Sequence, residues 1–289
     1  LMSRRRRYDR YRRRHKKNRY DIKKIVLFAV LVIAAIGLLI ILGSQILSHK
    51  DEYYKQGTEY YNKGDYATAL EYFNDALDEK QLFSKKTDMN IHMYIADICL
   101  QQQRYTDAVD EYKRVELYKK ADKEQTEILK NMSQALSDFN KGNYAGTVDL
   151  FMKAAKAGYT TMYVYAGTCY AETEQYDKML ECYDKYIAEY GYNSYLYTQL
   201  AAYYLKTGDL DQAYGYIQTG LTSDKTYNLN LRLLEIAYYE AMSNYDEAFG
   251  LVSDLLTQYP DNEQAQKEYD FLYTRASHDK GNTDVTEGE

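Results

Sequence analysis

Apolar and polar residues follow three different patterns along this chain. Residues 1–24 are mostly polar, whereas residues 25–42 are an unbroken apolar run, IVLFAVLVIAAIGLLIIL, and the uncharged stretch extends to residue 47. From about residue 50 onward, apolar residues recur three and four positions apart between short polar turns. That spacing is typical of amphipathic helices. The pattern therefore predicts an all-α chain in which one long apolar helix precedes a helical body.

The apolar run has the length of a membrane-spanning helix. A helix of 18 to 23 residues is about 27–35 Å long, and the hydrocarbon core of a bilayer is about 30 Å thick. Fourteen of the 18 residues in 25–42 are Ile, Val, Leu or Phe. We therefore expect residues 25–47 to form a single transmembrane signal-anchor helix. Cleavage as a signal peptide stays open, because the small residues Gly43 and Ser44 are suited to a cleavage site.

Charge divides the chain at the same place. Residues 1–24 hold 13 Lys and Arg against two Asp, a net charge of +11, while the remainder carries −17. Basic residues beside a transmembrane helix stay in the cytoplasm, so we expect a cytoplasmic tail at 1–24 and an extracytoplasmic body. The tail is expected to bind anionic lipid headgroups. Arg-rich segments also bind nucleic acid, but 24 residues hold no folded module for it, and we expect no nucleic-acid partner.

A short phrase recurs six times in the body. It reads KGDYATALEYFNDAL at 63–77 and KGNYAGTVDLFMKA at 141–154, and its aromatic or apolar anchor residue is spaced by 39, 39, 32, 34 and 35 residues. A period near 34 indicates stacked helix–turn–helix repeats. The glycines before three anchors suit a helix that ends and reverses. The anchors are Tyr66, Tyr105, Tyr144, Tyr176, Leu210 and Tyr245.

These phrases resemble the tetratricopeptide repeat. In the first repeat, Tyr53, Gly57, Tyr60, Ala69, Phe73 and Ala76 stand at the family's packing positions. Repeats two and three depart from the pattern, with His92 and Asn131 at the aromatic position and Thr147 in place of an alanine. The resemblance implies a right-handed solenoid of about six repeats over 50–262. Residues 263–275 are expected to form a capping helix, and 276–289 a disordered acidic tail.

In that family the first helix of each repeat lines a concave groove that binds peptides. Members that bind chaperone tails use Lys and Asn there, whereas this chain has Tyr54, Thr58, Met93 and Asp97. The resemblance therefore implies a groove for an apolar or basic protein or peptide segment and disfavours a chaperone adaptor. The implied groove residues are Tyr54, Thr58, Tyr61, Met93, Asp97, Leu136, Phe139, Val164, Thr168, Tyr195, Thr198, Ala202 and Leu205.

The sequence offers little for catalysis. Its four His are scattered, and it lacks the HExxH, GxGxxG, GxSxG and phosphate-loop motifs. We expect no enzyme activity, no cofactor and no metal site, and we expect His92 to have a packing role. The cysteines Cys99, Cys169 and Cys182 are expected to be free core residues. A bridge between Cys169 and Cys182 stays open if their Cα atoms approach within about 7 Å.

Together these patterns predict a membrane-anchored interaction scaffold that works in bacterial envelope assembly, secretion or cell-wall processes. Two alternatives stay open. The first is a receptor on an organelle surface whose repeats face the cytosol. The second is a protein that binds glycan or peptidoglycan, because the 36 Tyr include several beyond the packing positions, and exposed Tyr is common on recognition surfaces.

Overall fold

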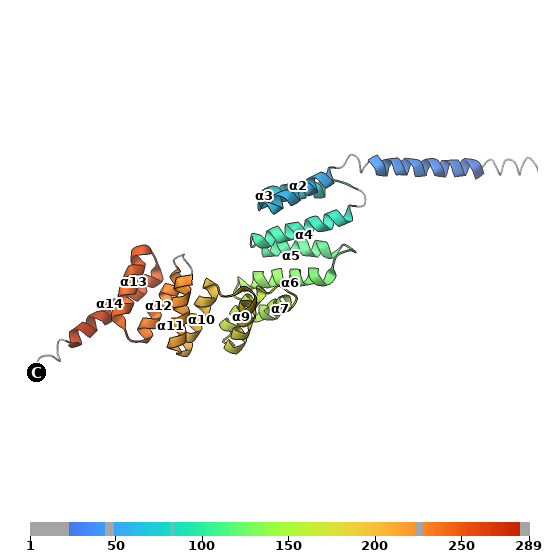
Figure 1. Ribbon diagram of the computed structural model, residues 1–289. Coiled ribbons are helices and arrows are strands. Elements are labelled where there is room, and N and C mark those ends of the chain that lie inside the picture. The colour runs from blue at the N-terminus through green and yellow to red at the C-terminus, as the bar shows by residue number, and fades with distance from the viewer. Residues whose placement is uncertain (1–22, 44–48, 82–83, 224–227, 284–289) are drawn as a thin grey trace, which may run out of the picture. The chain divides into compact units, whose positions relative to one another are not determined.

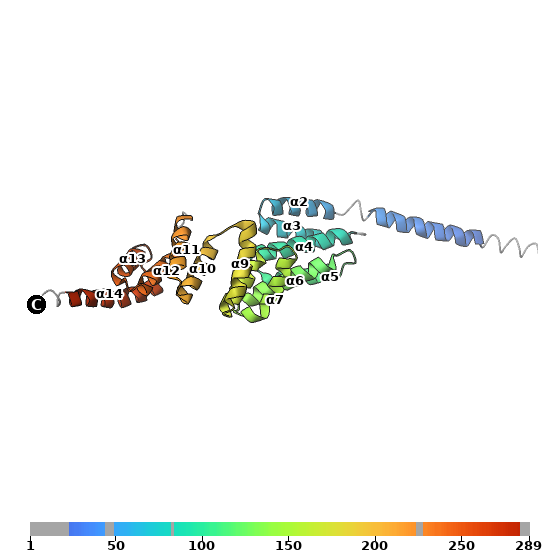
Figure 2. The ribbon, with the colours of Figure 1, turned by 60° about the horizontal axis from the view of Figure 1, so that its bottom comes forward.

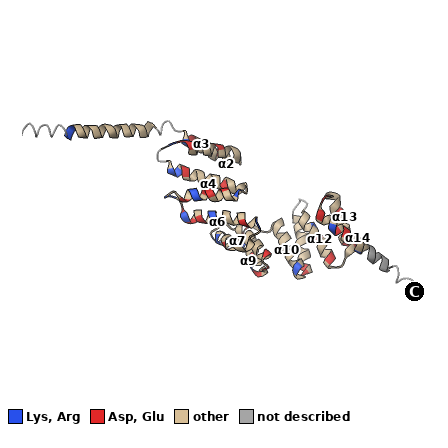
Figure 3. Ribbon diagram, turned by 180° about the vertical axis from the view of Figure 1, so that it is seen from behind, with Lys and Arg blue, Asp and Glu red and all other residues tan. Residues whose placement is uncertain are grey.

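A computed structural model describes residues 23–43, 49–81, 84–223 and 228–283. The predicted tail at 1–24 is thus outside the described residues apart from Lys23 and Lys24, as are residues 44–48 and 284–289. The first described element is the helix Lys23–Gly43, which has a mean hydropathy of 3.4 and no buried part. Figure 3 shows it without charge except at its blue beginning. By length and composition it is able to cross a membrane, as an anchor or as a signal sequence.

The helical body divides into two compact units, which meet in sequence between Glu174 and Gln175. In unit 1, successive helices pack as antiparallel hairpins (Figure 1), and the turned view in Figure 2 shows the same order. Its helices are α2 (Lys50–Asn62), α3 (Tyr66–Asp78), α4 (Lys85–Gln101), α5 (Tyr105–Glu116), α6 (Lys123–Phe139), α7 (Tyr144–Lys156) and α8 (Met162–Glu172).

Unit 2 continues the series, and every regular element in the described part of the chain is a helix. The last helix, α14, extends eight residues beyond the predicted capping segment, into the stretch expected to be a tail. The helices are α9 (Tyr176–Tyr190), α10 (Ser194–Thr207), α11 (Leu210–Ser223), α12 (Leu229–Ala241), α13 (Tyr245–Gln258) and α14 (Glu263–Thr283).

Each of the six predicted anchors is the first residue of the second helix of its repeat, which confirms the helix–turn–helix pattern. The residue two positions before every anchor has a left-handed backbone. Gly64, Gly142 and Gly208 occupy three of these positions at φ of 77°, 81° and 82°. The other three hold Gln103, Glu174 and Ser243 at φ of 58°, 57° and 58°. A left-handed residue closes the preceding helix and turns the chain, so the repeat imposes this conformation whether or not glycine is present.

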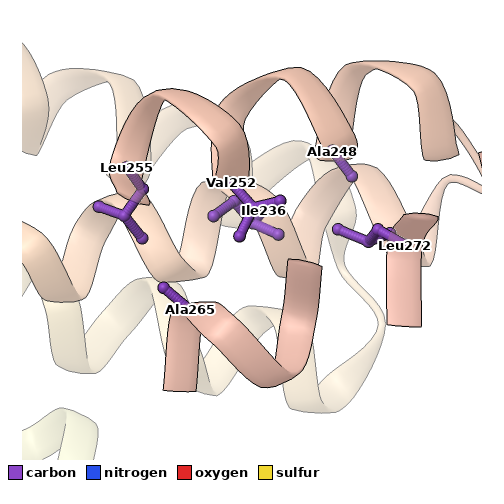
Figure 4. Close-up of a cluster of buried hydrophobic side chains, with 6 residues drawn as sticks. All are labelled: Ile236, Ala248, Val252, Leu255, Ala265 and Leu272. Atoms are coloured by element: carbon purple, nitrogen blue, oxygen red, sulfur yellow. The ribbon is translucent and has the colours of Figure 1, made fainter. Parts of the chain in front are cut away.

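The core is built from residues three and seven positions after each anchor, which share one face of the second helix. In the first repeat these are Ala69 and Phe73, and both are fully buried. In the last repeat, Ala248, Val252 and Leu255 of α13 face Ile236 of α12 and Ala265 and Leu272 of α14 (Figure 4). Helix α14 thus covers the last repeat, as expected of a capping element.

Candidate functional site

A hollow of about 430 Å³ lies on unit 1 between the first helices of repeats one and two. We call it the N-hollow. Its walls come from α2 and α4, where side chains three, four and seven positions apart share a helix face. Four of the predicted groove residues meet here. The lining residues are Tyr54, Tyr61, Asn90, Met93, Tyr94 and Asp97.

Aromatic contacts and one hydrogen bond fix the geometry of the N-hollow. The Tyr61 hydroxyl donates to the Asp97 carboxylate. The ring of Tyr94 stands edge-on to Tyr61 at 4.9 Å and stacks on the buried Phe73 at 5.2 Å. Burial, and secondly the hydrogen bond to Asp97, raise the pKa of Tyr61 far above its usual value. Tyr61 therefore stays protonated and acts as the donor to Asp97, beside an aromatic wall.

A second hollow, of about 350 Å³, lies on unit 2, and we call it the C-hollow. It is formed by α10, α12 and α14, so the capping helix contributes part of its wall. Among the predicted groove residues, Thr198 and Ala202 line it. The remaining lining residues are Gln199, Asn230, Leu233, Leu234, Ile236, Ala237, Glu240, Gln264 and Glu268.

Two carboxyl groups meet at the wall of the C-hollow. Glu240 of α12 has a buried oxygen, Oε1, which makes no hydrogen bond to any described residue. Burial, followed by the charge of Glu268 on α14, raises the pKa of Glu240 to about 7. Two carboxylates that share a desolvated site do not both ionise easily. A positively charged group placed at this wall would relieve the repulsion between the two carboxylates, so the wall favours a basic ligand.

The structure places the other predicted groove residues differently from one another. Leu136 and Thr168 are buried. The Thr58 and Thr168 hydroxyls donate to carbonyls of their own helices at 2.9 Å. Phe139 packs edge-on against Phe151 and Tyr165 inside unit 1. Val164 is half-buried, Leu205 packs on the core of unit 2, and Tyr195 is 41% exposed.

Several lining residues were missed at the level of sequence. In the N-hollow these are Asn90 and Tyr94, which lie on the same face of α4 as Met93 and Asp97. The helical spacing of positions 90, 93, 94 and 97 is the sequence signal that could have identified Asn90 and Tyr94. In the C-hollow the missed residues include Glu268, on α14. No repeat phrase marks that helix, so the sequence gives no register that would place it in a groove.

The cysteine side chains and His92, which lie outside the hollows, are buried within the helical body. Cys99, Cys169 and Cys182 are buried thiols that form no disulfide, so the cysteine bridge left open by the sequence is not formed. His92 is 7% exposed, and its Nδ1 lies 2.7 Å from a carboxylate oxygen of Glu111. Within the described ranges, no group of three or more His, Cys, Asp or Glu side chains is arranged to hold a metal ion.

Part of the chain matches a known repeat family. The family described as "Tetratricopeptide repeat" matches residues 54–123. A search among curated proteins finds no match. Among solved structures, PilF of Pseudomonas aeruginosa is 15% identical, with a TM-score of 0.55 over 80% of this chain and 99% of its own.

A second solved structure supports the same fold. PilW, described as a widely conserved type IV pilus biogenesis factor, is 18% identical, with a TM-score of 0.55 over 75% of this chain and 97% of its own. At these identities the likeness concerns the fold, and no catalytic family is indicated. The repeat match over residues 54–123, the six anchors at their helix starts and the two similar structures show a helical solenoid of tetratricopeptide type.

Proposed function

We propose that this chain is a single-pass membrane scaffold that presents a tetratricopeptide groove to a protein or peptide partner on the extracytoplasmic side. The anchor is inferred from the helix Lys23–Gly43, which has no buried part and a mean hydropathy of 3.4. Exposed apolar surface on this scale marks a contact with lipid or another protein. The +11 charge of residues 1–24 supports retention of the tail in the cytoplasm, next to anionic headgroups.

The two hollows support the choice of ligand. The N-hollow combines Tyr and Met side chains with the carboxylate of Asp97, and the C-hollow combines Leu and Ala with Glu240 and Glu268. Apolar walls that carry a few acidic side chains suit a peptide segment with apolar and basic side chains. We place the work of the scaffold in bacterial envelope assembly, secretion or cell-wall processes. The described role of PilW in pilus biogenesis is in keeping with such a role.

Site-specific crosslinking in cells tests the groove. A photoreactive amino acid at Met93 or Thr198 is expected to capture a discrete partner. The same amino acid at Asn74 is the control, because Asn74 is exposed on α3, which lines neither the N-hollow nor the C-hollow. Asp97→Lys should reduce capture at position 93 if the partner is basic. Equal capture at positions 74, 93 and 198 would contradict the groove assignment.

Membrane topology is tested separately. The full chain should resist alkaline extraction from membranes, and protease added to spheroplasts should digest the body while sparing the tail. A body protected in spheroplasts and digested only after lysis would instead favour repeats that face the cytosol, as in an organelle-surface receptor.

Binding to glycan or peptidoglycan is the second candidate. It is favoured by four Tyr of unit 2 that are 38–55% exposed, namely Tyr190, Tyr192, Tyr195 and Tyr214. Exposed aromatic rings stack on sugars as readily as they pack on peptides. Sedimentation with purified cell walls distinguishes the two. Wall binding that is lost when these four Tyr become Ser would favour the second candidate.

A further inference from the structure

A basic patch interrupts the acidic body at one end of unit 1. It surrounds a hollow of about 460 Å³ lined by Lys85, Lys86, Leu117, Tyr118, Lys119 and Lys120, which we call the lysine patch. It joins the beginning of α4 to the turn that follows α5. Figure 3 shows blue ribbon at the end of unit 1 where α4 begins. Residues 25–289 carry −17 in total, so this cluster differs in sign from the body around it.

The charge of the patch is available to a ligand. Lys85, Lys86, Lys119 and Lys120 are exposed and form no salt bridge with any described carboxylate. The acids nearby are occupied within the unit. Asp88 accepts from Lys50 Nζ at 2.6 Å and from Ser84 Oγ at 3.0 Å, and Glu116 pairs with Lys130. Asp122 caps α6, and Glu124 on its first turn is exposed.

An exposed leucine stands among these lysines. Leu117 is 83% exposed, more than any other large apolar side chain in the described residues. Its neighbour Tyr118 is half-buried and packs against His92, with ring centroids 6.1 Å apart. Apolar and aromatic side chains flanked by Lys are the composition of surfaces that lie in the headgroup region of a bilayer. A purely ionic site would have no use for Leu117.

Covalent geometry brings this end of unit 1 near the membrane. Gly43 ends the apolar helix and Lys50 begins α2. Seven residues span at most about 25 Å. Lys50 is 2% exposed, and its ion pair with Asp88 fastens the start of α2 to the first turn of α4, where the patch begins. An anchored chain therefore keeps the lysine patch within reach of the bilayer surface.

We propose that the lysine patch docks on anionic lipid headgroups of the membrane that holds the apolar helix. The proposal rests on the anchor of the proposed function. An anionic surface repels the net negative remainder of the body and attracts the lysine patch, so docking favours this end of unit 1 at the membrane. Each lysine near such a surface favours the docked state by about fivefold. Leu117 then enters the headgroup layer while the lysines bind phosphate.

The test uses the full chain reconstituted in vesicles, with a fluorophore on a single introduced cysteine and a lipid-borne quencher. The label goes at Leu117→Cys or, as a control, at Gln101→Cys, which is exposed at the end of α4 far from the lysine patch. With phosphatidylglycerol we expect several-fold stronger quenching at position 117 than at position 101. With phosphatidylcholine alone, quenching at 117 should fall to the level of 101.

Charge variants make the test specific. Lys85→Gln, Lys86→Gln, Lys119→Gln and Lys120→Gln together should abolish the excess quenching at 117. The same change in charge at Lys63, Lys141, Lys153 and Lys156, which are exposed elsewhere on unit 1, should preserve it. Circular dichroism should be unchanged in both variants, because all eight lysines are exposed.

Three results would overturn the proposal. They are no quenching at 117 in anionic vesicles, equal quenching in both lipids, and equal loss in the two charge variants. The first result, no quenching at 117 in anionic vesicles, is also expected if the patch binds an acidic protein instead of lipid. Flotation of the chain with the vesicles reports insertion of the apolar helix independently. A chain that floats without docking therefore refutes the patch and spares the anchor, and one that fails to float refutes the anchor.

Discussion

At the scale of single residues, the left-handed residue two positions before each anchor shows what backbone conformation costs when no packing contact is involved. Gly142 has φ of 81°, and a Cβ placed on it would contact nothing within 4 Å. Ser243 holds the equivalent position at φ of 58° and is exposed. The left-handed conformation costs a residue with a Cβ about 1–2 kcal/mol and costs glycine little.

Opposite substitutions at these two turns should therefore have opposite effects. Gly142→Ala is expected to lower the free energy of unfolding by about 1 kcal/mol, and Ser243→Gly to raise it by up to about 1 kcal/mol. Chemical denaturation of the two variants beside the parent chain measures both. If the two substitutions shift stability in the same direction, the repeat does not impose the turn conformation.

Another glycine is required for a different reason. Gly57 lies inside α2, where an added Cβ would stand 2.6 Å from Cδ1 of the fully buried Phe73. Gly57→Ala should destabilise unit 1 by about 1–3 kcal/mol, because a packed ring has no room to move. The matched control is Gly215→Ala in α11, where nothing lies within 4 Å. That change should stabilise by up to about 1 kcal/mol. Thermal unfolding that ranks the two variants in the reverse order would contradict the packing argument.

At the scale of elements, α14 completes unit 2 in two ways. It covers the core of the last repeat with Ala265 and Leu272, which are fully buried. It also brings Glu268 beside Glu240 of α12, and burial, followed by the charge of this neighbour, raises the pKa of Glu240 to about 7. The capping helix therefore makes the interface between α12 and α14 sensitive to pH.

The sign of that dependence follows from the direction of the shift. Glu240 ionises near its ordinary pKa of 4.5 in the unfolded chain and near 7 in the folded chain. Between pH 4.5 and pH 7 the folded chain keeps the Glu240 proton, whereas the unfolded chain has released it. The contribution of Glu240 to the free energy of unfolding is therefore complete below about pH 4.5 and is lost as the pH rises through 7.

We expect the melting temperature of unit 2 to fall between pH 5 and pH 8 by less in Glu240→Gln than in the parent chain. Melting monitored at both pH values measures the difference, since other groups contribute equally to both proteins. Glu71→Gln, which alters an exposed carboxylate on α3, should leave the pH dependence unchanged. An equal fall in all three proteins would show that Glu240 does not titrate in this range.

At the scale of the whole molecule, the anchor and the body should be separable. The buried residues of the body come from its own helices, and the helix Lys23–Gly43 contributes no buried surface. Removal of residues 1–47 should therefore give a soluble protein with the helical content of the body, measured by circular dichroism and gel filtration. An insoluble or mostly unfolded product would show that the body needs the anchor to fold.

The sequence by itself determined the elements. Six anchors spaced by 32 to 39 residues coincide with six helix starts, because the repeat places glycine or polar turn residues before each one and apolar residues at helical spacing after it. The apolar run is likewise a local property, since length and hydropathy need no tertiary contact to be recognised. The tertiary structure decided which side chains of a helix face remain accessible.

Leu136 shows this second point most clearly. It occupies a groove position by register, yet it is buried. Conversely, Glu268 follows the last repeat and still lines the C-hollow, because α14 packs on α13 and turns that face toward α12. Accessibility depends on the neighbours that a face meets. Those neighbours lie tens of residues away in sequence, and the spacing of residues within one helix carries no information about them.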